Sequence, residues 1–157
     1  MNDATPALAE AVFSGTYWAV VALTVLLAGL AVWLHYEALE RLNFWLPRWG
    51  VRPQPRVLLL IIGILLVHTV EIWIFGAGIF WMAQYPSMGW ISGDADIRLL
   101  DAVYLSATTF TTVGYGDLAP HGPMRFTMGS EALTGSVLIT WSASFTFLEM
   151  QRFWRQH

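Results

Sequence analysis

Three long segments of this chain are almost free of charged residues and contain no proline. They run from Val12 to Leu34, from Val57 to about Ala83, and from Phe126 to about Leu148. Each is long enough to cross the hydrocarbon of a bilayer, which takes about 20 apolar residues in a helix. All seven prolines, which break helix interiors, lie outside these segments. The pattern predicts an all-α integral membrane protein with three transmembrane helices.

Composition narrows the possible functions. Charged residues make up 12% of the chain, about half the usual share, and nine tryptophans suit the interface between a membrane and water. The absence of cysteine excludes disulfides, thiolate metal sites and a cysteine nucleophile. The net charge of −3 gives no basic surface for nucleic acid, and no combination of nucleophile, base and orienting group is visible. We therefore expect a lipid bilayer as the surroundings, no nucleic-acid partner and no enzyme.

The arginines indicate how the chain is oriented in the membrane. Cytoplasmic loops of membrane proteins carry an excess of Arg and Lys. The loop after the first apolar segment and the tail after the third are rich in arginine, whereas the N-terminus carries acids (Arg41, Arg48, Arg52 and Arg56; Arg152 and Arg155; Asp3 and Glu10). Residues 1–56 are thus expected to form an N-terminal transmembrane helix and a cytoplasmic loop. The N-terminus is expected outside, and residues 151–157 form a short cytoplasmic tail.

A further apolar stretch, residues 99–110, is too short to span a membrane. It has helical spacing of apolar residues and an acid, Asp101, in its first turn, which suits the helix dipole. It runs directly into the segment from Thr111 to Asp117. Backbone at membrane depth that is neither helix nor barrel persists only where it is buried in protein or lines a cavity. The sequence therefore predicts a re-entrant helix followed by a pore-lining loop.

The segment Thr112-Val113-Gly114-Tyr115-Gly116 matches the selectivity-filter signature of potassium channels. With its flanking segments, residues 57–150 resemble the pore domain of bacterial potassium channels, and the first helix lies outside the resemblance. The resemblance implies an outer helix at about 57–84, a pore helix at about 99–110, a filter at 112–116 and an inner helix at about 124–150. It also implies a homotetramer in the bacterial inner (plasma) membrane, with K+ as the permeant ion and no cofactor.

The filter residues suit a row of neutral backbone ligands. Carbonyl oxygens at Thr112, Val113, Gly114 and Tyr115 are expected to bind K+, and the Thr112 hydroxyl adds a ligand at the inner end. Gly114 and Gly116 can adopt positive φ without strain, as alternating carbonyl directions require. Val113 and Tyr115 are expected to turn outward and brace the filter.

Four residues are expected to support the filter, namely Tyr104, Thr108, Thr111 and Asp117. Asp117 matches the acid that follows the filter in the family. It either braces the outer end of the filter or attracts cations, or it is a solvated loop acid. In many members a carboxylate on the pore helix pairs with this acid, but the matching position here is Thr108. Asp94, Asp96 and Asp101 outnumber Arg98, and they form either a cation-attracting vestibule or an ordinary solvated face.

Gly135 and Phe147 are the gating candidates on the inner helix. Gly135 is either a hinge or a site of close packing with Gly129, Ser130 and Ser136, because glycine in a helix interior costs about 1 kcal/mol relative to alanine and needs a reason. Phe147 is either a hydrophobic constriction or a packing or lipid-facing side chain. The same register places Ser136, Ile139, Ala143 and Phe147 toward the pore.

His68, Glu71 and Glu131 are ionisable residues inside the apolar segments, where such groups are costly and point to function. His68 and Glu71 share a helix face, and Glu131 is expected to meet Ser106, Thr108 or His68. These residues form either a structural network that holds the pore helix or a pH sensor.

The sequence favours a potassium-selective channel over several alternatives. A transporter subunit usually carries several degenerate filters in one chain, and a weakly selective cation channel typically replaces the tyrosine that is Tyr115 here. A non-conducting membrane scaffold or auxiliary subunit stays open as an alternative, because a filter signature alone does not establish an open gate.

Overall fold

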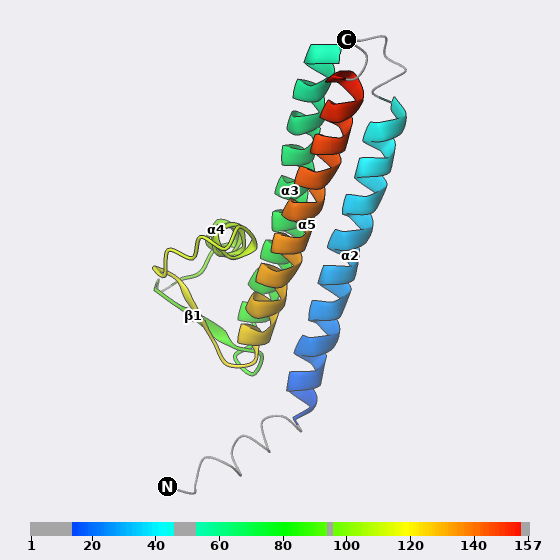
Figure 1. Cartoon of the computed structure of the whole chain (residues 1–157). Coiled ribbons are helices and arrows are strands. Elements are labelled where there is room, and N and C mark those ends of the chain that lie inside the picture. The colour runs from blue at the N-terminus through cyan, green and yellow to red at the C-terminus, as the bar shows by residue number, and fades with distance from the viewer. Residues whose placement is uncertain (1–13, 46–52, 94–95, 155–157) are drawn as a thin grey trace, which may run out of the picture.

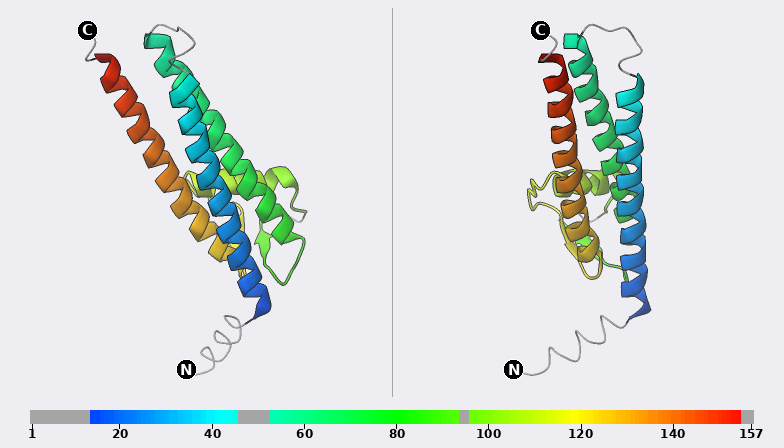
Figure 2. Two further views of the ribbon diagram at one scale, coloured as in Figure 1. Left: turned by 90° about the vertical axis from the view of Figure 1, so that its right-hand side faces the viewer. Right: turned by 45° about the vertical axis from the view of Figure 1, so that its right-hand side comes forward.

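The computed structural model describes residues 14–45, 53–93 and 96–154 of the chain. These residues form four helices and two short strands, in the order α2 (Gly15–Trp45), α3 (Pro53–Ala83), β1 (Trp90–Ser92), α4 (Leu99–Phe110), β2 (Ala119–His121) and α5 (Met124–Trp154). The three long helices have 31 residues each, about 46 Å, and run side by side as a bundle (Figures 1 and 2). Helix α4 and the strands lie against the bundle, toward the end at which α2 begins (Figure 1).

Two of the long helices, α2 and α3, are long and apolar enough to cross a membrane. Helix α5 has the same length but is less apolar, because it carries Glu131, Glu149 and many hydroxyl side chains. Five of these hydroxyls donate to the carbonyl four residues earlier in the same helix (Thr134, Ser136, Thr140, Ser144 and Thr146). Their hydrogen-bonding capacity is thus largely satisfied within α5 itself.

Helix α2 is an integral part of the bundle. Its buried residues recur at intervals of three or four and form one stripe along its length (Val20, Thr24, Leu27, Ala31, His35 and Leu39). This stripe faces α3 and α5, and the hydroxyls of Thr24 on α2 and Thr127 on α5 lie 2.7 Å apart in a buried hydrogen bond. Helix α2 is therefore fixed by polar as well as apolar contacts.

A small antiparallel sheet contacts both α3 and α5. Strand β1 pairs with β2 in the register Trp90↔His121, Ile91↔Pro120 and Ser92↔Ala119. The rings of Trp90 and His121 stack with centroids 5.1 Å apart, and the Ser92 hydroxyl lies 2.9 Å from His121 Nε2. These two strands add to the predicted all-α architecture. Three-residue strands that pair across some thirty residues leave no periodic pattern in the sequence.

The helix bounds differ from the sequence predictions chiefly at the end of α2, the start of α3 and the end of α5. Helix α4 coincides with the predicted short helix, but α3 begins before residue 57 because prolines are tolerated in the first turn of a helix. The prediction that Arg41, Arg56 and Arg152 lie in a loop or tail is therefore wrong, since they belong to α2, α3 and α5. The other residues used to orient the chain lie outside the described residues (Asp3, Glu10, Arg48, Arg52 and Arg155).

Candidate functional site

Helix α4 begins with a reciprocal cap. The Asp101 carboxylate accepts hydrogen bonds from the Arg98 backbone N–H at 2.9 Å and from Arg98 Nε at 3.2 Å. These two hydrogen bonds hold the pKa of Asp101 below its usual value, and the bond from the Arg98 backbone has the larger effect. Asp101 therefore caps α4 and pairs with Arg98. Of the other predicted vestibule acids, Asp96 is exposed and Asp94 lies outside the described residues.

Two glycines let α4 approach the long helices closely. A Cβ atom added at Gly76 on α3 would lie 2.7 Å from Cα of Val103, and one added at Gly135 on α5 would lie 2.2 Å from the carbonyl oxygen of Phe110. Both distances are shorter than the contacts that real Cβ atoms make. These contacts favour the packing interpretation of Gly135. The partner of Gly135 in this packing is the end of α4.

Glu131 also holds α4, from the side of α5. The Ser106 hydroxyl on α4 lies 2.5 Å from Glu131 Oε1 and 2.9 Å from the carbonyl oxygen of Ile72 on α3. A hydroxyl has one hydrogen, so it can donate to only one of these oxygens at a time. Glu131 is fully buried, and its Oε2 has no hydrogen-bond partner among the described residues. Of the three partners expected for Glu131, the structure provides Ser106.

The loop after α4 has an alternating backbone. Thr112, Gly114 and Gly116 have φ values of 59°, 54° and 82°. The glycines adopt this left-handed conformation freely, as the sequence predicts, but the β-branched Thr112 is strained there at a cost of about 1–3 kcal/mol. Two backbone hydrogen bonds hold the turn, from the N–H of Thr112 to the Thr109 carbonyl (2.9 Å) and from the N–H of Gly114 to the Thr108 carbonyl (3.0 Å).

The side chains of this loop find few partners within one chain. All five residues 112–116 are exposed, including Val113 at 55% and Tyr115 at 73%. The Tyr115 ring lies parallel to that of Tyr104, with centroids 6.4 Å apart. The side of the loop that carries Val113 and Tyr115 is therefore uncovered in the single chain.

The expected supporting residues divide into two groups. The Tyr104 hydroxyl donates to Asp117 Oδ2 at 2.9 Å, so α4 and the residue after the loop are joined. Thr108 and Thr111 instead donate to carbonyls of their own helix, at Leu105 and Ala107. Thr108 thus contributes to the loop through its carbonyl, and its side chain makes no hydrogen bond to Asp117.

The residues expected to face a pore share an exposed side of α5. Ser136, Ile139, Ala143 and Phe147 are all exposed in the single chain. A hollow of about 440 Å³ lies beside them, between α3 and α5. It is lined by Ile139, Ala143 and Phe147 together with the partly buried His68 and the buried Ser142.

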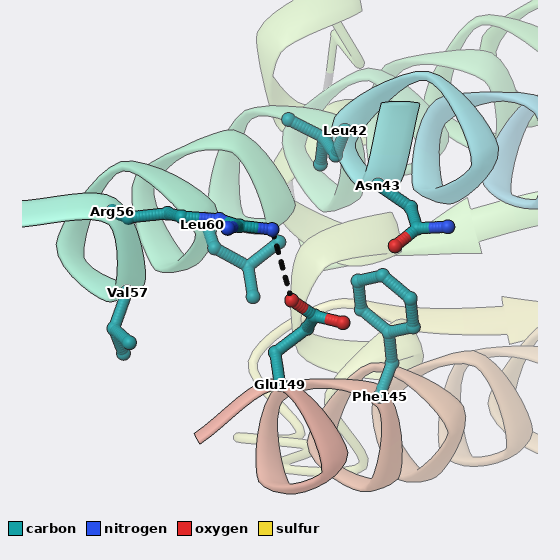
Figure 3. A pocket seen from close by; sticks show the side chains of 7 residues that line it. All are labelled: Leu42, Asn43, Arg56, Val57, Leu60, Phe145 and Glu149. Carbon is teal, nitrogen blue, oxygen red and sulfur yellow. Dashed lines mark hydrogen bonds and ion pairs between the residues drawn. The ribbon is translucent and has the colours of Figure 1, made fainter. Parts of the chain in front are cut away.

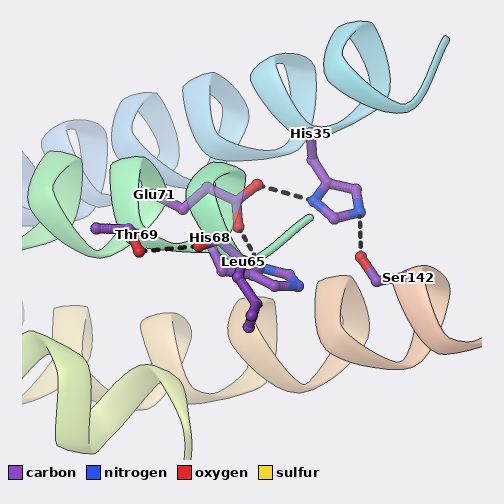
Figure 4. A network of polar contacts seen from close by, with 6 residues as sticks. All are labelled: His35, Leu65, His68, Thr69, Glu71 and Ser142. Atoms are coloured by element: carbon purple, nitrogen blue, oxygen red, sulfur yellow. Dashed lines mark hydrogen bonds and ion pairs between the residues drawn. The ribbon is translucent and has the colours of Figure 1, made fainter. Parts of the chain in front are cut away.

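Glu71 is the centre of a separate buried network (Figure 4). Its Oε2 lies 2.7 Å from Nδ1 of His68, as their spacing predicts, and its Oε1 lies 2.8 Å from Nδ1 of His35 on α2. The Ser142 hydroxyl on α5 lies 3.3 Å from His35 Nε2. This network joins the three long helices, whereas the sequence interpretation assigned it to the pore helix. Sequence reasoning missed His35, although it lies on the buried stripe of α2.

The start of α3 and the end of α5 are joined by a further ion pair that sequence reasoning missed (Figure 3). Arg56 Nη2 lies 3.3 Å from Glu149 Oε2, and Arg152 Nη1 lies 2.5 Å from Glu149 Oε1. Glu149 is buried, and Leu42, Leu60 and Phe145 pack around the pair. The contact closes the end of the bundle opposite the loop.

Comparison with known proteins identifies the class. A profile described as ion channel matches residues 57–152, which is more than half of the chain, so the chain belongs to this ion channel family. It is 40% identical over 72 residues to two pore potassium channel b of Oryza sativa subsp. japonica, and 52% identical over 40 residues to two pore potassium channel a of the same organism. These matches cover 45% and 26% of this chain but only 17% and 12% of the relatives. No solved structure gives a significant match.

Proposed function

We propose that the protein is a potassium-selective channel that conducts K+ passively. The alternating positive φ values at Thr112, Gly114 and Gly116 carry this proposal. Such alternation turns successive carbonyl oxygens of residues 112–115 toward one side, where they can replace the hydration shell of K+. Neutral oxygens bind the ion without holding it as tightly as carboxylates would. Membership of the ion channel family and the names of the rice relatives support the same conclusion.

A complete pore requires further copies of the chain. One chain supplies one loop, and residues 112–116 of this loop are all exposed in the single chain. A ring of carbonyls around one axis closes when four copies meet, as in the pore domains that residues 57–150 resemble. In that assembly Val113 and Tyr115 are covered, and the exposed face of α5 with Ile139 and Phe147 lines the inner cavity.

The bundle supports a three-helix arrangement in the membrane. Helices α3, α4 and α5 take the places of outer helix, pore helix and inner helix, and α5 matches the length of the two more apolar helices beside it. The start of α2 lies at the same end of the bundle as the loop and its sheet (Figure 1). We therefore propose that the N-terminus lies on the outer side and the C-terminus in the cytoplasm, in a bacterial inner membrane.

A flux assay tests the proposal. The purified protein is reconstituted in liposomes, and K+ and Na+ fluxes are compared with and without Ba2+. We expect K+ flux that Ba2+ blocks, and much smaller Na+ flux. Equal Na+ flux contradicts selectivity, and the absence of any flux in protein of correct oligomeric mass contradicts a channel.

A pair of glycine variants locates the filter. Gly114→Ala forces alanine into the left-handed region and is expected to abolish K+ flux without dissociating the oligomer. Gly29→Ala is the matched control, because Gly29 lies in α2 and an added Cβ meets nothing within 4 Å. Wild-type flux through Gly114→Ala would show that residues 112–116 are not the filter.

A further inference from the structure

Three side chains with metal-binding atoms converge within the bundle, away from the loop. They are His35 from α2 and His68 and Glu71 from α3, and one ligand atom from each lies within 4.8 Å of the others. His35 and Glu71 are fully buried, and 13% of the His68 side chain is exposed. We propose that this cluster binds a divalent transition-metal ion such as Zn2+.

The donor atoms suit such an ion. Zn2+ takes imidazole nitrogens and carboxylate oxygens as ligands at about 2.0–2.1 Å, and a set of two histidines and one carboxylate is common. Tetrahedral coordination separates neighbouring ligand atoms by about 3.3 Å. Nδ1 of His35 and Nδ1 of His68 lie 2.8 and 2.7 Å from Oε1 and Oε2 of Glu71, and these two contacts need to open by about 0.5 Å. The widest separation among the three ligand atoms, at most 4.8 Å, needs to close to about 3.3 Å.

Charge balance favours the same conclusion. A carboxylate buried among apolar helices is stable when it is paired with positive charge. Within the described part of the chain, the ion pairs of arginines lead to Glu37, Asp101 and Glu149, and none leads to Glu71. Its contacts are the two imidazoles, so a divalent cation held between the three groups neutralises the carboxylate.

The surroundings orient the ligands and give access to them. A histidine that binds metal through one nitrogen usually donates the proton on the other nitrogen to a neighbouring acceptor. The Ser142 hydroxyl lies 3.3 Å from His35 Nε2 and is such an acceptor (Figure 4). His68 lines the hollow between α3 and α5, which provides a path for the ion and space for a water ligand. The protein supplies three ligands, and a water completes the tetrahedral shell.

Binding to the purified full-length chain tests this proposal without any measurement of ion flux. The protein, treated with a chelator, is titrated with ZnCl2 by calorimetry, and a parallel titration with Co2+ reports coordination geometry through its visible spectrum. We expect one Zn2+ per chain and a Co2+ spectrum of tetrahedral type. The absence of saturable binding, or a purely octahedral Co2+ spectrum, would overturn the proposal.

Variants assign the binding to the cluster. Glu71→Gln keeps the size of the side chain and one acceptor oxygen but removes the anionic ligand, and we expect Zn2+ affinity to fall by about 100-fold or more. Ser142→Ala leaves all three ligands in place and is expected to weaken binding by about 10-fold. His121→Gln is the control, because His121 lies in the small sheet, and its affinity should equal that of the wild type.

One further variant covers the case in which Glu71→Gln does not fold. His68→Gln alters a partly exposed ligand and leaves the contacts between His35, Glu71 and Ser142 in place. It is expected to lose Zn2+ binding while it keeps the oligomeric mass of the wild type. Wild-type affinity in His68→Gln would show that the metal binds elsewhere.

Discussion

Gly135 on α5 lies directly against the carbonyl oxygen of Phe110, the last residue of α4. A Cβ atom at Gly135 would lie 2.2 Å from this oxygen and 2.9 Å from the Phe110 ring. The position at which the loop after α4 begins is therefore set by the absence of a side chain at Gly135 on the neighbouring helix. A glycine that permits this contact cannot be replaced without moving α4.

Gly135→Ala is the first test of this relationship. We expect it to lower the free energy of unfolding by about 1–3 kcal/mol, as overpacking does, and to reduce K+ flux because the loop moves with α4. Gly129→Ala is the control on the same helix, since an added Cβ there meets nothing within 4 Å. Thermal unfolding and liposome flux measure both effects. Unchanged stability and flux in Gly135→Ala would contradict the packing role.

The contact between Ser106 and Glu131 gives a second prediction. Glu131→Gln supplies an amide that donates to Ser106 Oγ, so the Ser106 hydroxyl can donate to the Ile72 carbonyl at the same time. We expect Glu131→Gln to retain the oligomer and wild-type stability within about 1 kcal/mol. Glu131→Leu removes the hydrogen-bonding partner and should cost about 1–3 kcal/mol.

Measurement of K+ flux against pH in Glu131→Gln distinguishes the two functions considered for this residue. A structural role predicts that the pH dependence of the wild type is retained. If the variant keeps its oligomeric mass but loses the pH response, Glu131 is a sensor and the structural interpretation fails.

The hydrogen bond between Tyr104 and Asp117 gives a third prediction. Tyr104→Phe keeps the ring that lies parallel to Tyr115 but removes the donor to Asp117. Both residues are exposed in the single chain, so we expect a loss of about 1 kcal/mol or less in stability, together with altered K+ conduction. Tyr85→Phe is the control, because its hydroxyl makes no hydrogen bond within the described residues. Identical single-channel currents in both variants would show that Asp117 does not depend on this bond.

The ion pair between the start of α3 and the end of α5 gives a fourth prediction. Glu149 is buried and accepts from Arg56 and Arg152, so its replacement by Ala leaves a partly buried guanidinium without this partner. We expect Glu149→Ala to lower the free energy of unfolding by about 3 kcal/mol. Glu37→Ala, which breaks a more exposed pair with Arg41, should cost less than about 0.5 kcal/mol. Equal losses in chemical unfolding experiments would contradict a special role for Glu149.

The sequence predicts most strongly those features that depend on local pattern. The spacing of apolar residues and the acid Asp101 mark the bounds of α4, and the glycines at 114 and 116 mark the positive φ values of the loop. The contact of His68 with Glu71 also follows from helical spacing. In each case residues close in sequence determine the geometry.

Features that depend on contact between distant segments were not predictable from the sequence. His35 and Glu71 meet because α2 and α3 pack in one particular register, and the Arg56–Glu149 pair joins helices that are far apart in the chain. Pairing between β1 and β2 likewise depends on how α3 and α5 are placed. The left-handed Thr112 was missed because its residue type disfavours that conformation, and only the surrounding loop imposes it.

The pairing of β1 with β2 has a consequence for how such proteins can diversify. The paired strands hold the start and the end of the intervening segment next to each other. Helix α4 and its loop therefore form an insertion whose two ends are fixed. Substitutions or changes of length inside this insertion need not alter the distance between α3 and α5. Under the proposed function, ion selectivity can therefore vary, or be exchanged by grafting between related chains, while the three long helices and their buried polar contacts remain the same.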